Sequence, residues 1–346
     1  MPARSSLRRC ALSLALALPP AGCAGGAATT APPAPASAAA PALASAGARA
    51  EPAGLHTVRF VTVAEGVELE VLDWGGSGPP VVFLAGLGGT AHVFDEFAPA
   101  LTDRFHVYGI TRRGNGRSSV PKTGYALPTM ALDLLHALDG LGLRRVRLVG
   151  HSAAGEEMTL FAGDHPERID RLVYLDAAYD RTDPTMRPSG ECFNVEPPVE
   201  SDLATPASFG AWFARSRGVR LPEGEVHMLF EHHGPPEAGA REYMVSLPRP
   251  DYSRLKAPAL ALYAVPLSAA DYYPAWGRMD AAARAKAQAC FERGAGQASA
   301  QASRADFRAR AARGHVVEYA RAKHFLFLSN RAEVLAETKA FLAGER

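Results

Sequence analysis

The sequence has no excess of charge of either sign. Its 346 residues include 37 Lys and Arg against 36 Asp and Glu, which gives a formal net charge of +1. A chain balanced in this way generates no basic surface field, so the composition gives no support for a nucleic-acid partner. With 47% hydrophobic residues, the chain can fold as one large α/β domain or as two smaller ones.

The apolar run near the N-terminus is short. Residues 10–18 are too few to cross a bilayer as a helix, and they follow the basic residues Arg4, Arg8 and Arg9. This pattern is typical of a secretion signal. The signal ends in P-P-A-G-C, which is similar to the small-small-Cys end of a bacterial lipobox, with Pro20 in place of the usual Leu. We therefore expect a lipoprotein signal peptide over 1–23 with a lipid on Cys23; ordinary cleavage nearby is the alternative.

Large apolar side chains are scarce in residues 24–54, where Ala, Pro, Gly, Ser and Thr dominate. A segment with so little to bury is expected to be a disordered tether. It would join a folded domain at 55–346 to a membrane through the lipid on Cys23. The expected location is the bacterial cell envelope, on its periplasmic or extracellular face, and a freely secreted protein is the alternative.

Cysteine is rare, with four residues in the whole chain. If Cys10 leaves with the signal and Cys23 is acylated, only Cys192 and Cys290 remain. Exported proteins meet oxidising conditions in which two thiols can pair. We hypothesise a disulfide between these two cysteines.

Strands and helices alternate through the rest of the chain. Residues 57–74 read as an antiparallel edge hairpin, with a bulge between Phe60 and Val61 where the apolar alternation changes phase. Further strands are predicted at 81–84, 105–110, 146–149, 172–175, 258–265 and 315–319, and helices at 91–101, 128–141, 156–162, 280–314 and 330–342. Such alternation indicates a doubly wound parallel sheet, in which ligands bind at the carboxyl ends of the strands.

One serine lies where a predicted strand must turn sharply into a helix. The segment G-H-S-A-A-G places small residues around Ser152, with Gly150 two positions before it and Ala154 two positions after it. Small residues are needed there because a larger Cβ would collide with the adjoining backbone. Ser152 is therefore a candidate nucleophile, and the alternative is a serine that only caps the helix.

This turn resembles the nucleophile elbow of the α/β-hydrolase superfamily, although the strict pattern has Gly where Ala154 stands. The resemblance implies a mostly parallel eight-stranded sheet flanked by helices. It also implies an inserted, mainly helical cap at about 181–255, where strands and helices stop alternating.

The resemblance further implies a Ser-acid-His order along the chain. His324 is the expected base, because it follows the last predicted strand and precedes the closing helix. Two carboxylates compete for the third position. Asp271 is the first one beyond the strand at 258–265 and is preferred, while Asp176 ends the preceding strand and is the rival.

A glycine-rich loop, A-G-L-G-G-T at 85–90, follows the strand at 81–84. By resemblance, the Leu87 and Ala153 backbone amides would form the oxyanion hole. The loop T-R-R-G-N-G-R-S at 111–118 also matches the superfamily, with Thr111 in place of Asp, and its arginines (Arg112, Arg113 and Arg117) are interpreted as fixing the loop or lying at the surface.

The histidines other than His324 suggest no metal site. His151 adjoins the nucleophile but is expected to pack below the turn. His227, His232 and His233 lie in the predicted cap without a third ligand at metal spacing, so no metal is predicted.

The resemblance as a whole implies a cofactor-free serine hydrolase that acts on a small-molecule ester, thioester or amide. Other chemistries of the same fold stay open, namely an aminopeptidase, a carbon–carbon hydrolase or a peroxidase-like enzyme. A non-catalytic ligand-binding lipoprotein is the third alternative, because Ala85, Thr111 and the loop after Val265 depart from the superfamily pattern.

Overall fold

The computed structural model describes residues 54–345 apart from 187–191, 193–195, 233 and 295–296. The predicted signal peptide, the predicted lipid attachment at Cys23 and the predicted tether at 24–54 lie outside the described residues except for Gly54. Among the helices that are described, none combines the length and the apolar character needed to cross a membrane.

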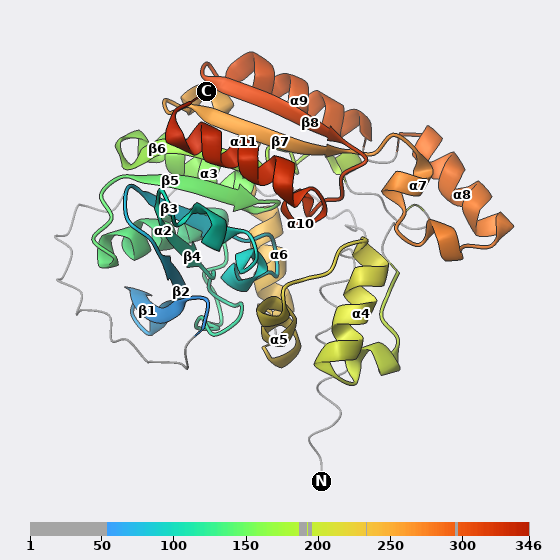
Figure 1. Cartoon of the computed structure of the whole chain (residues 1–346), viewed down its shortest axis with the longest axis horizontal. Coiled ribbons are helices and arrows are strands. Elements are labelled where there is room, and N and C mark those ends of the chain that lie inside the picture. The colour runs from blue at the N-terminus through green and yellow to red at the C-terminus, as the bar shows by residue number, and fades with distance from the viewer. Residues whose placement is uncertain (1–53, 187–191, 193–195, 233, 295–296, 346) are drawn as a thin grey trace, which may run out of the picture.

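The centre of the fold is one eight-stranded sheet (Figure 1). Its strands follow the order β1-β2-β4-β3-β5-β6-β7-β8. The β1–β2 and β2–β4 pairs are antiparallel, and every other neighbouring pair is parallel. The strands are β1 (Thr57–Ala64), β2 (Val67–Gly75), β3 (Pro80–Leu84), β4 (His106–Ile110), β5 (Val146–His151), β6 (Ile169–Leu175), β7 (Ala259–Val265) and β8 (Gly314–Ala320). This confirms the predicted fold class.

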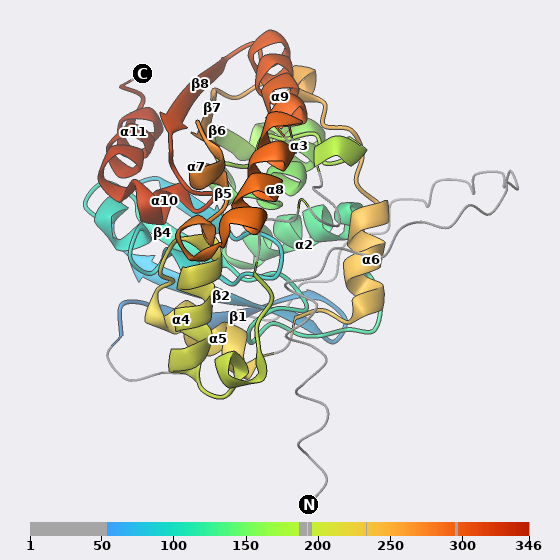
Figure 2. The ribbon, with the colours of Figure 1, turned by 90° about the vertical axis from the view of Figure 1, so that its right-hand side faces the viewer.

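Helices cover both faces of the sheet, and the strands are apolar on both sides for that reason. In β3, Val82 and Leu84 join the core under α2 (Leu127–Gly140), α3 (Ala154–Asp164) and α9 (Gln297–Arg310). Val81 and Phe83 join the opposite core, which lies under α10 (Leu326–Ser329) and α11 (Arg331–Ala343). Figure 2 shows the two layers on either side of the strands.

Three local predictions are wrong. The segment 280–314 is not one helix but holds α8 (Ala281–Glu292) and α9 (Gln297–Arg310), and its last residue, Gly314, begins β8. The segment 91–101 is not one helix but two short 3-10 helices, η1 (Ala91–Phe94) and η2 (Ala98–Leu101). Pro99 lacks the amide hydrogen that a continuous helix would donate to the carbonyl of Asp95. The bulge is also misplaced, because the β1–β2 register is continuous through Phe60 and Val61 and shifts only between Thr62 and Ala64. Phe60 and Val61 pack against different cores, so the change of phase needs no bulge.

Among the described residues between β6 and β7, the cap consists of the α-helices α4 (Pro206–Arg217), α5 (Glu223–Glu231) and α6 (Glu237–Val245). The side chain of Thr205 caps the start of α4, and Gly218, with φ of +74°, ends it in the left-handed region. In Figure 1, α4 and α5 lie below the sheet. Tyr243 of α6 donates its hydroxyl hydrogen to the Ala153 carbonyl at 2.9 Å, which ties the cap to the turn that carries Ser152.

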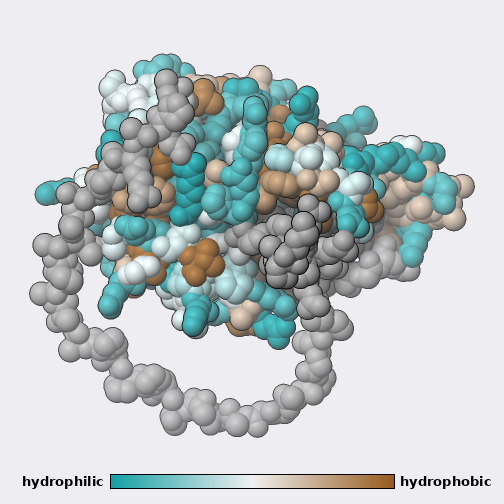
Figure 3. Space-filling view, turned by 90° about the horizontal axis from the view of Figure 1, so that it is seen from below, coloured by the Kyte–Doolittle hydropathy of each residue, from teal (hydrophilic) through white to brown (hydrophobic). Residues whose placement is uncertain are grey.

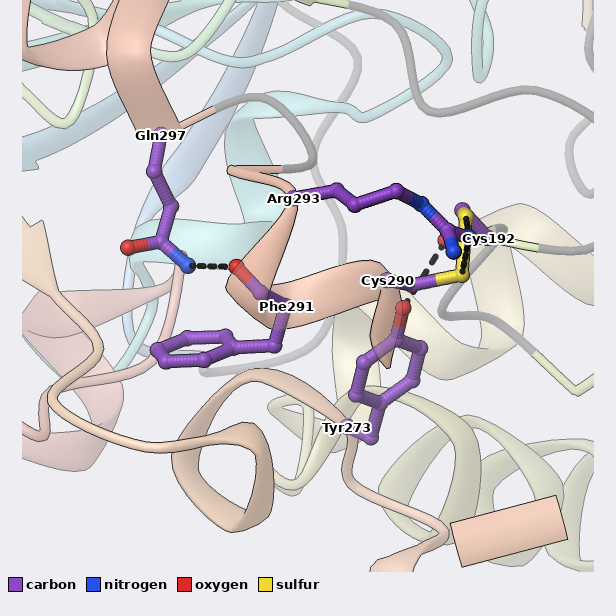
Figure 4. Close-up of a disulfide and its surroundings, with 6 residues drawn as sticks. All are labelled: Cys192, Tyr273, Cys290, Phe291, Arg293 and Gln297. Carbon is purple, nitrogen blue, oxygen red and sulfur yellow. Dashed lines mark hydrogen bonds between the residues drawn. A yellow bond between two sulfur atoms is a disulfide. The ribbon is translucent and has the colours of Figure 1, made fainter. Parts of the chain in front are cut away.

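A second excursion, between β7 and β8, contains α7 (Ala269–Tyr272), α8 (Ala281–Glu292) and α9. Cys290 of α8 forms a disulfide with Cys192, which confirms that hypothesis (Figure 4). The Tyr273 hydroxyl donates to the Cys192 carbonyl at 3.2 Å, and the Arg293 guanidinium lies against both sulfurs. The disulfide therefore fastens α8, which projects beyond the sheet in Figure 1, to the chain ahead of the cap.

The surface of the described residues is mixed. Seen from below, hydrophilic side chains cover most of the coloured area, with apolar ones in separate spots (Figure 3). The large apolar side chains that are exposed come from many parts of the chain: Leu55, Leu87, Val120, Leu132, Val199, Val245 and Leu267. Of these, Leu87 belongs to the glycine-rich loop.

Candidate active site

The turn between β5 and α3 holds Ser152 in a strained conformation, with φ of +53°. A Cβ built on Gly150 would lie 2.2 Å from the Met158 sulfur, and one built on Gly155 would lie 1.9 Å from the Ala177 carbonyl oxygen. The predicted need for glycine two residues before Ser152 is therefore met. Two residues after Ser152, the buried Ala154 is accommodated. The position that has no room for a Cβ is the next one, Gly155.

His324 connects Ser152 to a buried carboxylate. Its Nε2 lies 2.8 Å from the Ser152 hydroxyl oxygen, and its Nδ1 lies 2.6 Å from Oδ2 of Asp176. A carboxylate can only accept here, so Nδ1 carries the hydrogen and Nε2 is free to accept the serine proton. The three side chains are thus aligned for proton transfer from the hydroxyl.

Asp176 sits directly after β6, with φ of +50°, and is 5% exposed. Its second oxygen, Oδ1, accepts hydrogen bonds from the Tyr179 hydroxyl and from the Ala264 amide at 2.9 Å. Burial and the neighbouring Asp176 charge raise the pKa of Tyr179 well above its ordinary value, so Tyr179 stays a donor. Both carboxylate oxygens are therefore held in place.

The preference for Asp271 as the partner of His324 is wrong. Asp271 lies on α7, where its carboxylate accepts from the Ser268 hydroxyl at 2.9 Å and from the Leu267 amide at 3.1 Å. Its role in the structure is to close this local turn. The sequence places Asp176 at the end of a predicted strand, and the structure shows that this strand, β6, pairs with β5, which leads to Ser152.

His151 is buried below the turn, as predicted, and it has a positioning role that the sequence did not reveal. Its Nε2 donates to the His324 carbonyl at 3.1 Å, and its ring packs on Phe325 at 4.6 Å between centroids. Burial lowers the pKa of His151 well below its ordinary value, so the ring stays neutral. The residue before the nucleophile therefore holds the backbone of His324.

The glycine-rich loop adjoins the nucleophile, since a Cβ built on Gly86 would lie 3.1 Å from Cβ of Ser152. Nη1 of Arg112 donates to the carbonyls of Ala85 at 2.6 Å and Gly86 at 3.2 Å. In a trans peptide the N–H points opposite to the C=O, so the Leu87 amide is turned away from Arg112.

The two predicted oxyanion donors are the amides of Leu87 and Ala153. Within the described part of the chain, neither amide donates to a protein group. Ala153 stands at the start of α3, where free amides and the helix dipole favour negative charge.

The arginines of the 111–118 loop fix that loop, as predicted. Arg112 pairs with Glu157, and Arg113 forms a two-bond pair with Asp133 at 2.5 and 2.6 Å, all buried. Arg117 is half-buried, with its Nε 3.9 Å from Glu70.

Two cavities meet at Ser152 and His324. The smaller, of about 240 Å³, is largely apolar, and its lining includes Gly86, Leu87, Val93, Phe213, Leu221, Glu225, Leu229 and Phe325. The larger, of about 420 Å³, has a mixed lining, whose charged and polar members include Asp176, Tyr179, Arg181, Arg217, Asp271, Arg304 and Lys323. Arg217 lines both cavities.

Arg181 reaches the nucleophile and was missed by sequence reasoning. Its Nη2 lies 3.4 Å from the Ser152 hydroxyl oxygen, and its Nη1 pairs with the buried Glu156. Arg181 lies six residues after the end of β6, and Glu156 lies in the first turn of α3. No sequence motif marks either residue.

A group with metal-ligand chemistry lies away from the nucleophile. His56, His92 and Asp95 place one ligand atom each within 4.8 Å of one another. His92 and Asp95 are hydrogen-bonded at 3.1 Å, and Asp95 also accepts from the Trp74 indole at 3.2 Å. No sequence pattern marks this cluster, because His56 lies 36 residues before His92 in the chain.

No metal site is predicted at the histidines of the cap. His227 lies 3.8 Å from each of Glu223 and Glu231 on exposed α5 positions. His232 ends α5, and His233 lies outside the described residues.

A family model described as the alpha/beta hydrolase fold matches residues 79–259, and the chain belongs to this family. Among its relatives is a provisionally named carbamate hydrolase, RutD, from Caulobacter segnis. It is 33% identical over 175 residues, which are 47% of this chain and 64% of the relative. Across the Caulobacter relatives of this name, the match spans 58–64% of their length. Hydrolase activity is thus supported for the family region.

Solved structures repeat the fold over most of the chain. E-2-(acetamidomethylene)succinate hydrolase has a TM-score of 0.59 at 20% identity, with coverage of 83% of this chain and 99% of its own. A provisionally named lipase from Acinetobacter baumannii has a TM-score of 0.60 at 15% identity, with coverage of 84% of this chain and 92% of its own. At such identities the likeness is one of fold.

Proposed function

We propose that this protein is a serine hydrolase that cleaves an ester, thioester or amide through an acyl-enzyme. Ser152 is the nucleophile, His324 the base and Asp176 the acid. The observation that carries the proposal is the pair of His324 hydrogen bonds, 2.8 Å to Ser152 and 2.6 Å to Asp176. A histidine held between a strained serine and a buried carboxylate can activate the hydroxyl at neutral pH.

The reaction proceeds in two halves. The Ser152 oxygen attacks the substrate carbonyl carbon while its proton passes to Nε2 of His324, and Asp176 stabilises the resulting imidazolium. The Leu87 and Ala153 amides hold the negative oxygen of the tetrahedral intermediate. The leaving group departs with the proton from His324, and water then releases the acyl group by the same sequence of proton transfers in reverse order.

The bond to be cleaved belongs to the carbonyl class. A carboxylate nucleophile, as epoxide-hydrolase chemistry requires, is absent at residue 152. The name of the Caulobacter relatives adds carbamates, whose carbonyl is also flanked by a heteroatom, to the substrates worth testing.

A fluorophosphonate probe tests the proposal, because it forms a covalent bond only with an activated serine. We expect labelling of the wild-type protein and none of the Ser152→Ala variant. A series of 4-nitrophenyl esters of increasing acyl length should show turnover that the variant lacks. A folded wild-type protein that is neither labelled nor active on esters, thioesters, amides or carbamates would contradict the proposal.

A further inference from the structure

The larger cavity beside Ser152 is rich in cationic side chains. Arg181, Arg217, Arg304 and Lys323 line it, against two carboxylates, Asp176 and Asp271. Both carboxylates are already engaged, Asp176 with His324 and Asp271 with Ser268. The lining therefore carries more positive charge than negative.

Two of these cations are neutralised by protein carboxylates. Arg181 pairs with Glu156, and Arg304 lies 3.3 Å from Glu318. Arg217 differs from them, because no carboxylate pairs with it among the residues that the structure describes. Its Nε is buried and has no hydrogen-bond partner in that part of the chain. Burial also lowers the pKa of Arg217, which shows how poorly its charge is compensated.

Lys323 reaches the same region from the other wall of the cavity. Its Nζ donates to the Asp271 carbonyl at 2.8 Å, and no ion pair is found for it among the described residues. A Cβ built on Gly218 would lie 3.3 Å from Cε of Lys323. The Lys323 side chain thus lies beside Gly218, the residue after Arg217. In the sequence, Lys323 directly precedes His324.

We propose that Arg217 and Lys323 bind a carboxylate of the substrate. The inference rests on the proposed function and defines its substrate class as esters, thioesters or amides that also carry a free carboxylate. The Nε of Arg217 is buried, but its two Nη atoms are not among the buried unpartnered atoms of the described residues. Two Nη atoms of one guanidinium can give a planar carboxylate two parallel hydrogen bonds. Because Arg217 lines both cavities together with Ser152 and His324, a carboxylate bound there leaves the rest of the substrate beside the nucleophile.

A matched pair of substrates tests this inference. Mono-4-nitrophenyl glutarate has a free carboxylate, and 4-nitrophenyl methyl glutarate is its neutral methyl ester. We expect the wild type to favour the first by roughly 10- to 100-fold in kcat/KM, the range of a hydrogen bond to a charged group. Arg217→Gln should abolish this preference, mainly through KM, whereas Arg220→Gln, an exposed arginine of the cap, should retain it.

A binding measurement separates this inference from the proposed function. Calorimetry of the Ser152→Ala variant with glutarate should show binding that the added Arg217→Gln change removes, and this result would stand even if no ester were hydrolysed. Equal wild-type rates on the two esters, together with no glutarate binding, would overturn the carboxylate site while leaving the hydrolase intact. Competition by inorganic phosphate at concentrations where glutarate has no effect would also overturn it.

Discussion

At the scale of single residues, the site depends on two residues with a left-handed backbone conformation, which residues other than glycine rarely adopt. Ser152 and Asp176 both have positive φ, at +53° and +50°. Such conformations cost about 1–3 kcal/mol each and persist only where the surroundings fix them. Close packing fixes both residues here. Gly155 has no room for a Cβ beside the Ala177 carbonyl, and the Asp176 carboxylate accepts a hydrogen bond from the Ala264 amide.

Substitution of the two candidate acids distinguishes them. Asp176→Asn should lower kcat by about 10³- to 10⁴-fold, because an amide no longer holds His324 in the tautomer that accepts the serine proton. Asp271→Asn should keep kcat within about twofold, because this carboxylate only closes the turn at Ser268. Steady-state kinetics on a 4-nitrophenyl ester measures both. A larger loss in Asp271→Asn than in Asp176→Asn would show that the acid is misassigned.

The sequence predicted those site residues that stand in a local motif. Ser152 lies in a run of small residues, and His324 is a lone histidine between the last strand and the closing helix. The sequence favours Asp271 over Asp176, because Asp271 is the first carboxylate after β7, where the acid of this family usually follows. Arg181 and Arg217 could not be found, since only the folded chain brings them to the cavity beside Ser152.

At the scale of elements, the cap helix α5 is docked on the glycine-rich loop through one buried side chain. Glu225 accepts from the Thr90 amide at 3.1 Å and is also bonded to the Thr90 hydroxyl. Burial raises the pKa of Glu225 to about 7, against the opposing effect of the Thr90 bonds. Nearby, burial alone would lower the pKa of His92, but hydrogen bonds and charge from Asp95 and Glu70 raise it to about 9.

These shifts define a pH dependence of stability. Between about pH 4.5 and 7 the folded protein retains a proton on Glu225 that the unfolded chain has released, so the free energy of unfolding falls as the pH rises. Glu225→Gln should remove that part of the pH dependence and leave the part between about pH 6.5 and 9 that His92 contributes.

Thermal unfolding at pH 5 to 9, followed by circular dichroism, measures this difference. Glu223→Gln is the matched control, because Glu223 is an exposed residue on the same helix. Its unfolding curve should follow the wild type. Parallel pH profiles for the wild type and Glu225→Gln would show that Glu225 does not titrate in this range.

The sequence predicted strands more successfully than the segments around them. Runs such as Val81–Leu84 are apolar at every position because both faces are buried, and that pattern is local. The 91–101 segment has helical spacing as well, but Pro99 interrupts its hydrogen bonds. In the edge strand β1, the Phe60–Val61 phase change reflects two cores rather than a bulge, which depends on contacts beyond the strand.

At the scale of the whole molecule, the disulfide links segments 98 residues apart. It brackets the cap and β7, so it restrains a large part of the unfolded chain. The double variant Cys192→Ser, Cys290→Ser should lose about 2–5 kcal/mol in the free energy of unfolding. Urea unfolding measures the change.

Dithiothreitol provides the control for this prediction. The reductant should bring the wild type to the stability of the double variant and leave the double variant unchanged. Equal stability of the wild type with and without reductant, despite complete reduction, would show that the disulfide has no such effect.

The order of the three aligned residues has a consequence for biosynthesis. Ser152, Asp176 and His324 follow one another along the chain, and His324 comes after the last strand of the sheet, β8. A ribosome that has made the sheet up to β7 has already produced the nucleophile and the carboxylate, but not the imidazole. Under the proposed mechanism, a nascent chain that ends before His324 lacks the base, so it should not react with a fluorophosphonate probe.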